Sequence, residues 1–134
     1  SCIGKGFKRT LLFTSDGSFH MNMNEIVTAV SYKLPIVIVL LDNNALGMVR
    51  QWQTLFFEGR YSQTTLNRET DYVKLAEAFG AAGFQSESIE EYQQCLEEAF
   101  KCEGPALIRC VIDSNERVLP MIPPGGSIND IILR

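Results

Sequence analysis

The sequence predicts an α/β domain built on a doubly wound parallel sheet with helices on both faces, and three observations indicate it. Short apolar runs rich in β-branched residues recur, segments with helical spacing separate them, and two of the runs end at polar side chains. Strands separated by helices require crossover connections, which place parallel strands side by side and helices against the sheet. At 134 residues the chain is long enough for one domain with a real core, and we expect residues 1–134 to form it.

The expected elements follow the order β-α-β-α-α-β-α-β. Strands are expected at residues 10–14, 36–41, 83–86 and 106–112, and helices at 22–33, within 45–57, at 72–79 and at 88–102. The run IVIVLL at 36–41 is apolar at every position, which is typical of a parallel strand covered on both faces. Gly80 is expected to end the third helix, and Ser88 with Glu91 matches a capping box that opens the fourth.

Composition and charge argue against several classes of protein. The net charge is −4 and no Lys/Arg cluster occurs, so we expect no nucleic-acid partner. The longest apolar run, 36–41, is too short to span a bilayer, and no signal-peptide pattern follows the basic N-terminal residues. We therefore expect a cytoplasmic protein with no membrane partner. The four cysteines form no C-x-x-C pair and the chain has one histidine, which favours reduced structural thiols over a zinc site.

Polar side chains that can bind a metal ion follow two of the predicted strands. Asp16 directly follows the first strand, and Asn43 follows the second, 27 positions later. Ligands bind beyond the carboxyl ends of parallel strands, so carboxylate and amide oxygens of neighbouring strands can meet around one ion. Such donors suit Mg²⁺ or Ca²⁺, and the backbone N–H groups of Gly17 and Ser18 would hold an anion beside it. These residues predict a Mg²⁺-bridged diphosphate, although Asp-Gly-Ser and Asn-Asn also occur in plain turns.

The motif and its flanking residues resemble a known family. Asp16-Gly17-Ser18 followed by Asn43 resembles the metal-and-diphosphate motif of thiamine-diphosphate enzymes, written GDG and, further along, NN. Four segments are similar to the catalytic large subunit of acetolactate synthase: DGSFHMNMNEIVTA, LDNNALGMVRQWQTLFFEGRYS, DYVKLAEAFGAAGF and VLPMIPPGG. The resemblance extends from Leu11 to Gly126, and the run Gly47–Gln53 is its most specific part.

The resemblance implies a role for each site residue. It implies that Mg²⁺ is coordinated by the side chains of Asp16 and Asn43 and by the backbone carbonyl of Ala45. The residues that it places around thiamine diphosphate are Gly17, Ser18, Leu46 and Gly47 at the diphosphate and Met48 near the rings. Trp52 would line the substrate channel. Without the resemblance, Met48 and Trp52 would be interpreted as core residues at helical spacing, and Ser18 as a helix N-cap.

Two positions depart from the family motif. Ser15 replaces the first glycine of GDG, which costs about 1 kcal/mol or more if that position needs a positive φ or a close backbone approach. Asp42 replaces the first Asn, which adds negative charge near a diphosphate unless Mg²⁺ offsets the charge or the side chain points away. His20, the only histidine, is interpreted as a partly exposed residue near the site and not as the acid–base group.

The resemblance also implies groups that lie outside this chain. In the family the activating glutamate belongs to the pyrimidine-binding domain of a partner subunit, so no catalytic residue is expected here. FAD would also bind to another part of the parent enzyme. We expect a C-terminal fragment of a longer, homo-oligomeric enzyme, with a regulatory subunit as a further partner. The parent reaction would decarboxylate pyruvate and condense the product with a second 2-keto acid in branched-chain amino acid biosynthesis, and the chain alone is expected to be inactive.

Other functions stay open at this point. Pyruvate oxidases and 2-keto-acid decarboxylases share the metal motif but neither the run Met48–Gln53 nor the VLPMIPPGG tail. A nucleotide- or phosphate-binding module is a second alternative, although the chain contains neither a complete G-x-G-x-x-G motif nor Gly-Lys-Ser/Thr. A non-catalytic interaction domain is a third, because neighbouring apolar residues would form an exposed patch. Those residues are Trp52, Leu55, Phe56 and Phe57.

Overall fold

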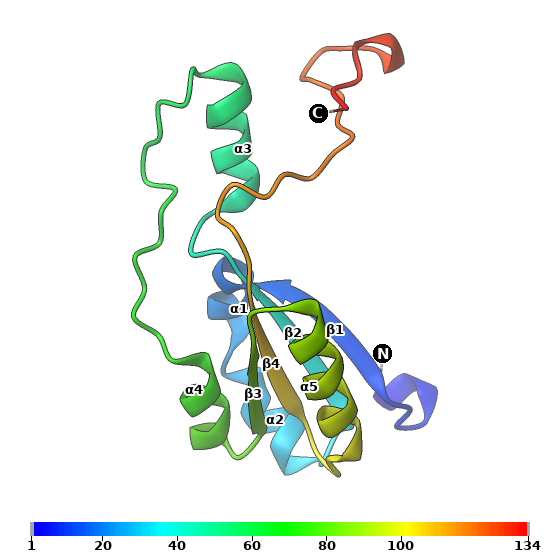
Figure 1. Cartoon of the computed structure of the whole chain (residues 1–134). Helices are drawn as coiled ribbons and strands as arrows, with labels where there is room; N and C mark the ends of the chain where they lie inside the picture. The colour runs from blue at the N-terminus through cyan, green and yellow to red at the C-terminus, as the bar shows by residue number, and fades with distance from the viewer. Residues whose placement is uncertain (1, 134) are drawn as a thin grey trace.

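A computed structural model describes residues 2–133, in which four strands form one parallel sheet (Figure 1). The strands are β1 (Thr10–Ser15), β2 (Ile36–Asp42), β3 (Ala82–Ser86) and β4 (Ala106–Val111). Their order across the sheet is β1-β2-β4-β3, and each neighbouring pair is parallel. At the carboxyl ends Ser15 lies beside Leu41, and Leu41 lies beside Cys110. The parallel sheet predicted from the sequence is confirmed.

Helices cover both faces of the sheet, as predicted. They are α1 (Asp16–Asn22), α2 (Glu25–Ser31), α3 (Gly47–Phe56), α4 (Tyr72–Phe79) and α5 (Ile89–Lys101), with 3-10 turns at Ile3–Lys5 and Ile128–Asp130. Buried side chains of α1, α2 and α4 pack on one face, which we call the α4 face, and α5 packs on the other, the α5 face. Helix α3 and the C-terminal segment extend beyond the carboxyl ends of the strands (Figure 1).

The core has two halves, one on each face of β2. Leu40 and Leu107 have no exposed surface and pack on the α4 face, whereas Val39 and Ile108 are buried on the α5 face. Successive strand residues point to opposite faces, so an apolar run fills both halves. The coverage is incomplete at the end of the strand, where Leu41 is 36% exposed.

The single helix expected at 22–33 is wrong, because two short helices occupy residues 16–31. Helix α1 already begins at Asp16 and ends at Asn22, and α2 begins at Glu25. Between them the N–H of Ile26 donates to the carbonyl of Met23 at 3.2 Å, a tighter turn than an α-helix makes. Asn22 and Asn24 flank the break, and asparagine favours turns over helix interiors because its side chain competes for backbone hydrogen bonds.

The predicted helix ends are largely confirmed. Gly80 ends α4 in the left-handed region with a φ of 91°, where glycine is favoured. The Ser88 hydroxyl accepts a hydrogen bond from the Glu91 N–H at 3.2 Å at the start of α5. The Glu91 carboxylate accepts from the Glu87 N–H at 2.7 Å, so the reciprocal half of the box reaches one residue further back.

The segment after β4 is irregular, as predicted, and is fastened to α3. The buried Gln51 side chain accepts a hydrogen bond from the Val118 N–H at 2.8 Å and donates to the Val118 carbonyl at 3.1 Å. Further along, Met121 and Ile132 form an isolated antiparallel bridge. The C-terminal segment therefore passes close to the beginning of α3, where the predicted site lies.

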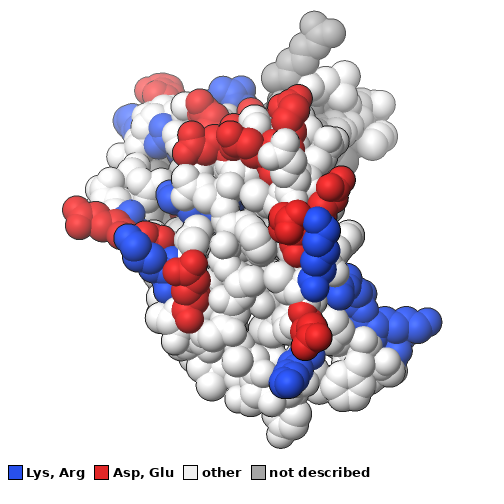
Figure 2. Space-filling view, turned by 60° about the horizontal axis from the view of Figure 1, so that its bottom comes forward, with Lys and Arg blue, Asp and Glu red and all other residues white. Residues whose placement is uncertain are grey.

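Charged side chains are mixed on the surface. On the face seen in Figure 2, Lys and Arg lie among Asp and Glu, with uncharged surface between them. None of the helices within residues 2–133 is both long and apolar enough to cross a bilayer.

Replacing Gly83 with alanine is expected to lower the free energy of unfolding by about 1–3 kcal/mol. Gly83 lies in β3, where an added Cβ would lie 2.8 Å from the backbone carbonyl oxygen of Val73 in α4. Urea unfolding followed by circular dichroism measures the change. Gly104→Ala is the matched control, because nothing lies within 4 Å of its added Cβ. Equal stability of the two variants would contradict the close contact between α4 and β3.

Candidate functional site

Asp16 lies where β1 passes into α1 and is almost fully buried. Its exposed fraction is 1%, and its Oδ1 accepts a hydrogen bond from the Gly17 N–H at 2.8 Å. The register pairs Ser15 with Leu41, so the next residues, Asp16 and Asp42, lie side by side at the carboxyl ends of the two strands. Burial raises the pKa of Asp16; the Gly17 hydrogen bond lowers it, and the Asp42 carboxylate raises it further. A cation beside Asp16 would stabilise its charged form against both the burial and the repulsion by Asp42.

Asp42, at the end of β2, is already paired with a cation. Its Oδ2 accepts a hydrogen bond from Nε of Arg109 at 2.7 Å, and its Oδ1 accepts from the Asn44 N–H at 3.3 Å. Arg109 lies on the adjacent strand β4 and donates through Nη1 to Gln85 on β3 at 3.1 Å. The negative charge that the sequence placed next to a diphosphate is therefore balanced within the protein.

Asn43 and Ala45 lie in the turn between β2 and α3. The Asn43 Oδ1 accepts a hydrogen bond from the Ala45 N–H at 3.1 Å. A hydrogen bond to the segment before α4 stabilises the turn: the Leu46 N–H donates to the Thr64 carbonyl at 2.8 Å. Ala45 is 3% exposed, and within residues 2–133 no backbone N–H donates to its carbonyl oxygen. That buried oxygen is available to a ligand.

A cavity of about 250 Å³ lies between the strand ends, the beginning of α3 and the C-terminal segment. Asn43, Ala45, Gly47 and Met48 line it, with Ser15 at the end of β1. The fold thus brings four of the predicted site residues to one cavity, next to the strand end that carries Asp16.

Two of the predicted glycines permit close packing at this site. An added Cβ on Gly17 would lie 3.2 Å from Cδ2 of Leu46, and one on Gly47 would lie 3.0 Å from Nδ2 of Asn43. Gly17 and Leu46, which come from different predicted segments, are therefore neighbours. Gly47 lets the backbone approach the Asn43 amide.

Ser15 carries no backbone strain, so the cost expected for a positive φ at this position does not arise. Its φ is −101°, in the extended region that any residue adopts. Its hydroxyl accepts from the Ser18 N–H at 3.4 Å, so Ser15 and not Ser18 is the N-cap of α1. The Ser18 side chain lines a different cavity, next to Phe19 and Ile26. The N–H groups predicted to hold an anion, those of Gly17 and Ser18, both have protein partners.

Met48 and Trp52 are surface residues of α3, which excludes the interpretation of them as core residues. They are 52% and 42% exposed and, being four positions apart, share one side of the helix. The Trp52 ring packs edge-to-face on Phe56 with the ring centroids 6.2 Å apart. Phe56 and Phe57 are also exposed, at 37% and 53%, whereas Leu55 is half-buried, so three of the four residues of the predicted apolar patch lie on the surface.

His20 lies on α1, outside the cavity. Its Nε2 is 3.1 Å from the Tyr72 hydroxyl, and its ring packs edge-to-face on the Tyr72 ring. Burial lowers the pKa of His20, and the charge of Arg68 lowers it further.

Three arginines near the site were not anticipated from the sequence. Besides Arg109, Arg68 donates through Nη1 to the Asp16 carbonyl at 3.2 Å, and Arg117 of the C-terminal segment lines the cavity. Arg109 could have been noticed, since it is the only charged residue in the strand sequence ALIRCV. Arg68 and Arg117 lie in irregular segments whose path the residue pattern does not predict.

The oxygen donors at the strand ends fit a hard divalent cation. They comprise the Asp16 carboxylate, the Asn43 amide and the Ala45 carbonyl, a set that suits Mg²⁺ better than zinc or copper. In the part of the chain that the structure describes, no three His, Cys, Asp or Glu side chains gather as metal ligands. All four cysteines are free thiols: Cys2, Cys95, Cys102 and Cys110.

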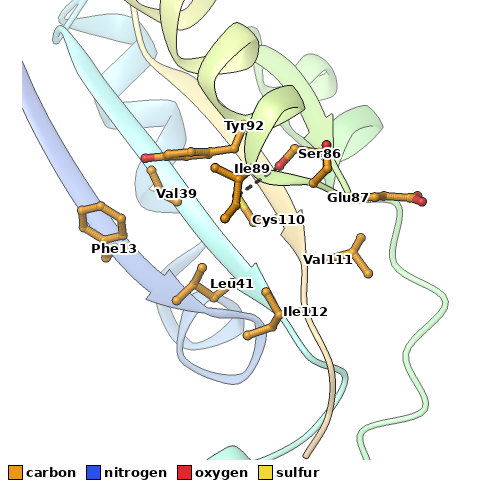
Figure 3. A pocket seen from close by; sticks show the side chains of 11 residues that line it. Phe13, Val39, Leu41, Ser86, Glu87, Ile89, Tyr92, Cys110, Val111 and Ile112 are labelled. Atoms are coloured by element: carbon orange, nitrogen blue, oxygen red, sulfur yellow. Dashed lines mark hydrogen bonds between the residues drawn. The ribbon is translucent and has the colours of Figure 1, made fainter. Parts of the chain in front are cut away.

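A larger cavity, of about 450 Å³, lies on the α5 face (Figure 3). Leu41 and Val39 of β2, Tyr92 of α5 and Ile112 line it, with Phe13 on β1 beside them. None of the predicted site residues lines this cavity, and its walls are mainly apolar. It marks the part of the sheet that α5 leaves uncovered.

Comparison with known proteins agrees with this geometry. Residues 3–110 match the family described as "Thiamine pyrophosphate enzyme, C-terminal TPP binding domain". The chain belongs to this family. The match includes both strand ends and the beginning of α3, and thus most of the residues that line the 250 Å³ cavity.

The curated relatives include acetolactate synthases. The isozyme 2 large subunit of Escherichia coli (strain K12) is 44% identical over 119 residues, which are 89% of this chain and 22% of the relative. The probable large subunit of Methanocaldococcus jannaschii is 40% identical over 130 residues, 97% of this chain and 22% of the relative. The resemblance inferred from the sequence is confirmed. The chain spans about a fifth of the length of these relatives.

Solved structures share the fold. A benzoylformate decarboxylase from Polynucleobacter necessarius superposes with a TM-score of 0.77 at 23% identity, over 87% of this chain and 22% of that protein. A thiamine diphosphate-dependent 4-hydroxybenzoylformate decarboxylase from Rhodococcus jostii RHA1 gives 0.72 at 24% identity, over 79% and 20%. At these identities the likeness concerns the fold alone.

Proposed function

We propose that this domain holds the diphosphate of thiamine diphosphate through Mg²⁺, as part of an acetolactate synthase large subunit. The observation that carries the proposal is the buried Asp16 carboxylate, set at adjacent strand ends with the Asn43 amide and the free Ala45 carbonyl. These three groups would coordinate the ion. Gly17, Ser18, Leu46 and Gly47 would surround the diphosphate, and Met48 would lie near the cofactor rings.

The cofactor supplies the electron sink for the chemistry when bound, and this chain's residues bind and orient it. The Ser18 N–H can donate to an anion in place of the Ser15 hydroxyl at little cost, because its hydrogen bond to that hydroxyl is long, at 3.4 Å. Arg117 in the cavity wall supplies a positive charge, next to the negative charge of Glu116. We assign no acid–base role to His20, which lies outside the cavity and bonds to Tyr72.

The finer parts of the proposal concern the parent enzyme and rest on the relatives' names. Pyruvate and a second 2-keto acid are the proposed substrates, in branched-chain amino acid biosynthesis in the cytoplasm, and FAD is a proposed cofactor outside this chain. The exposed Trp52 would line the substrate channel. A pyrimidine-binding domain of a partner subunit would complete the site in a homo-oligomer, with a regulatory subunit as a further partner.

Calorimetric titration of thiamine diphosphate into the 134-residue chain tests the proposal. With Mg²⁺ we expect weak binding, with a dissociation constant on the order of 1 mM, because only the diphosphate half of the site is present. With a chelator in place of Mg²⁺ the heat of binding is expected to disappear. Thiamine without its diphosphate is the matched control and should not bind.

The same samples separate this function from its alternatives. The chain alone is expected to form no acetolactate from pyruvate, since it carries no activating glutamate for the cofactor. Binding of Mg²⁺-ATP more tightly than Mg²⁺-thiamine diphosphate would instead favour a nucleotide-binding module. Binding of thiamine diphosphate that is indifferent to Mg²⁺ would rule out the metal-bridged site.

A further inference from the structure

The ion pair between Arg109 and Asp42 stands at the edge of the proposed cofactor site. Nε of Arg109 lies 2.7 Å from Oδ2 of Asp42, and the side chains are 28% exposed for Arg109 and 8% exposed for Asp42. The other carboxylate oxygen of Asp42 accepts the Asn44 N–H, so both oxygens are engaged within the protein. Nothing in the proposed metal and diphosphate contacts requires this arginine.

The pair turns the Asp42 carboxylate toward Arg109 on β4, beside the proposed metal ligands. Asp42 and Arg109 line a cavity of about 410 Å³ with Asn43 and Ala45, whereas neither of the paired residues lines the 250 Å³ cavity. Leu41, the preceding residue of β2, does line the 250 Å³ cavity, because successive strand residues point to opposite faces. Arg109 lies on β4 one strand away, and its guanidinium group lies on the α4 face near the Tyr72 ring, at 5.9 Å from the ring centroid.

The charge of Asp42 would matter if it were not balanced. Asp42 lies beside Asp16, close enough for the two carboxylates to repel. A free second carboxylate there would attract a bare divalent cation but would repel the diphosphate that the cation is meant to bridge. A protein with aspartate at this position therefore needs a fixed positive charge nearby.

We propose that Arg109 is a positioning residue of the cofactor site: its ion pair turns the Asp42 carboxylate toward β4 and cancels its charge. Asp42 thereby stays outside the metal's ligands, and a diphosphate can approach Asp16 and Asn43. This inference rests on the proposed function. Arg109 acts on the cofactor only through Asp42.

A positioning role and a purely structural role of Arg109 predict opposite changes in the affinity for a bare cation when the arginine is removed. Loss of a structural contact would loosen the strand ends and weaken every ligand. Loss of the positioning contact frees one carboxylate, so it strengthens binding of a bare cation and weakens binding of the diphosphate. Mn²⁺ is a suitable bare probe, because it takes the same oxygen ligands as Mg²⁺ and its binding is followed by electron paramagnetic resonance.

The test compares Arg109→Gln with the double variant Asp42→Asn/Arg109→Gln. In Arg109→Gln we expect Mn²⁺ alone to bind about tenfold more tightly and Mg²⁺-thiamine diphosphate about tenfold more weakly than in the unchanged chain. The double variant, which has neither charge, is expected to return both affinities to within about twofold. Arg109→Lys keeps the charge and is expected to resemble the unchanged chain. Arg60→Gln, which removes an exposed arginine, is the matched control and should change neither affinity.

Three results would overturn the proposal. They are an Arg109→Gln variant that weakens both ligands or changes neither, a double variant that fails to restore both affinities, and an Arg109→Lys variant that behaves like Arg109→Gln. If the unchanged chain binds no thiamine diphosphate with Mg²⁺, the proposed function fails, and the Mn²⁺ titrations alone decide the role of Arg109. Tighter Mn²⁺ binding in Arg109→Gln that the second substitution reverses supports the positioning role, and any other pattern rejects it.

Discussion

Replacing Asp16 with asparagine is expected to remove Mg²⁺-dependent binding of thiamine diphosphate and, at the same time, to stabilise the cofactor-free chain at neutral pH. The substitution keeps the shape of the side chain and removes its charge. Mutating a residue that only supports a metal ligand commonly costs about 10–100-fold in affinity, so loss of the single carboxylate ligand should cost more than about 100-fold. Stability moves the other way, because Asp16 is 1% exposed and lies next to the Asp42 carboxylate.

The pH dependence follows from the direction of the pKa shift. Burial, reinforced by Asp42, raises the pKa of Asp16 in the folded chain above the ordinary value of 3.8. Folding is therefore favoured when Asp16 is protonated, and this contribution is fully present below pH 3.8. It is lost as the pH rises through the raised pKa. The stability of Asp16→Asn relative to the unchanged chain should consequently increase from pH 4 toward pH 7.

Thermal unfolding between pH 4 and pH 7, with and without Mg²⁺ and thiamine diphosphate, measures both effects. At a ligand concentration 100 times its dissociation constant, binding adds about 2.7 kcal/mol to the unchanged chain and nothing to the variant, so their order of stability reverses. Asp71→Asn is the matched control. The Lys74 N–H lowers the pKa of Asp71, so the contribution of that carboxylate is lost as the pH falls, the opposite direction. An Asp16→Asn chain that still binds the cofactor with Mg²⁺ would refute the metal site.

The sequence predicts well which residues lie at the strand ends, because a parallel register depends on local pattern. The apolar run at 36–41 defines β2, and its end defines where Asn43 emerges. Once β1 and β2 are neighbours, the pairing of Ser15 with Leu41 follows, and it brings Asp16 to the same edge. Burial of Asp16 and of Ala45 could not be deduced in this way, since it depends on the segment before α4 that folds over the turn.

Contacts between distant residues account for what the sequence did not predict. The ion pair of Arg109 with Asp42 joins residues 67 positions apart on two strands whose adjacency no residue pattern specifies. The Ser15 hydroxyl replaces the glycine of the motif without strain because α1 begins at the very next residue and needs an N-cap. The helix is broken at residues 22–24, although the apolar spacing continues through them, because spacing does not take into account the preference of asparagine for turns.

Two adjacent leucines of β2, next to the proposed site, are expected to differ greatly in their contribution to the free energy of unfolding. Leu40 has no exposed surface, packs with Leu107 and Tyr72 on the α4 face and lies two positions before Asp42. Leu41, the next residue, points to the opposite face, where it lines the apolar cavity of Figure 3 and is 36% exposed. Two adjacent leucines on one strand thus differ in little except burial.

Leu40→Ala is expected to lower the free energy of unfolding by about 2–5 kcal/mol, and Leu41→Ala by less than about 1 kcal/mol. The first substitution leaves a cavity between β2 and α4 that the packed neighbours cannot fill, whereas the second removes atoms already in contact with water. Urea unfolding midpoints measure both, at equal concentration and without cofactor. A loss for Leu41→Ala as large as for Leu40→Ala would mean that the α5 face is covered in the chain in solution, for instance by a second copy. The concentration dependence of the midpoint would then identify that copy, because association stabilises the folded chain by mass action.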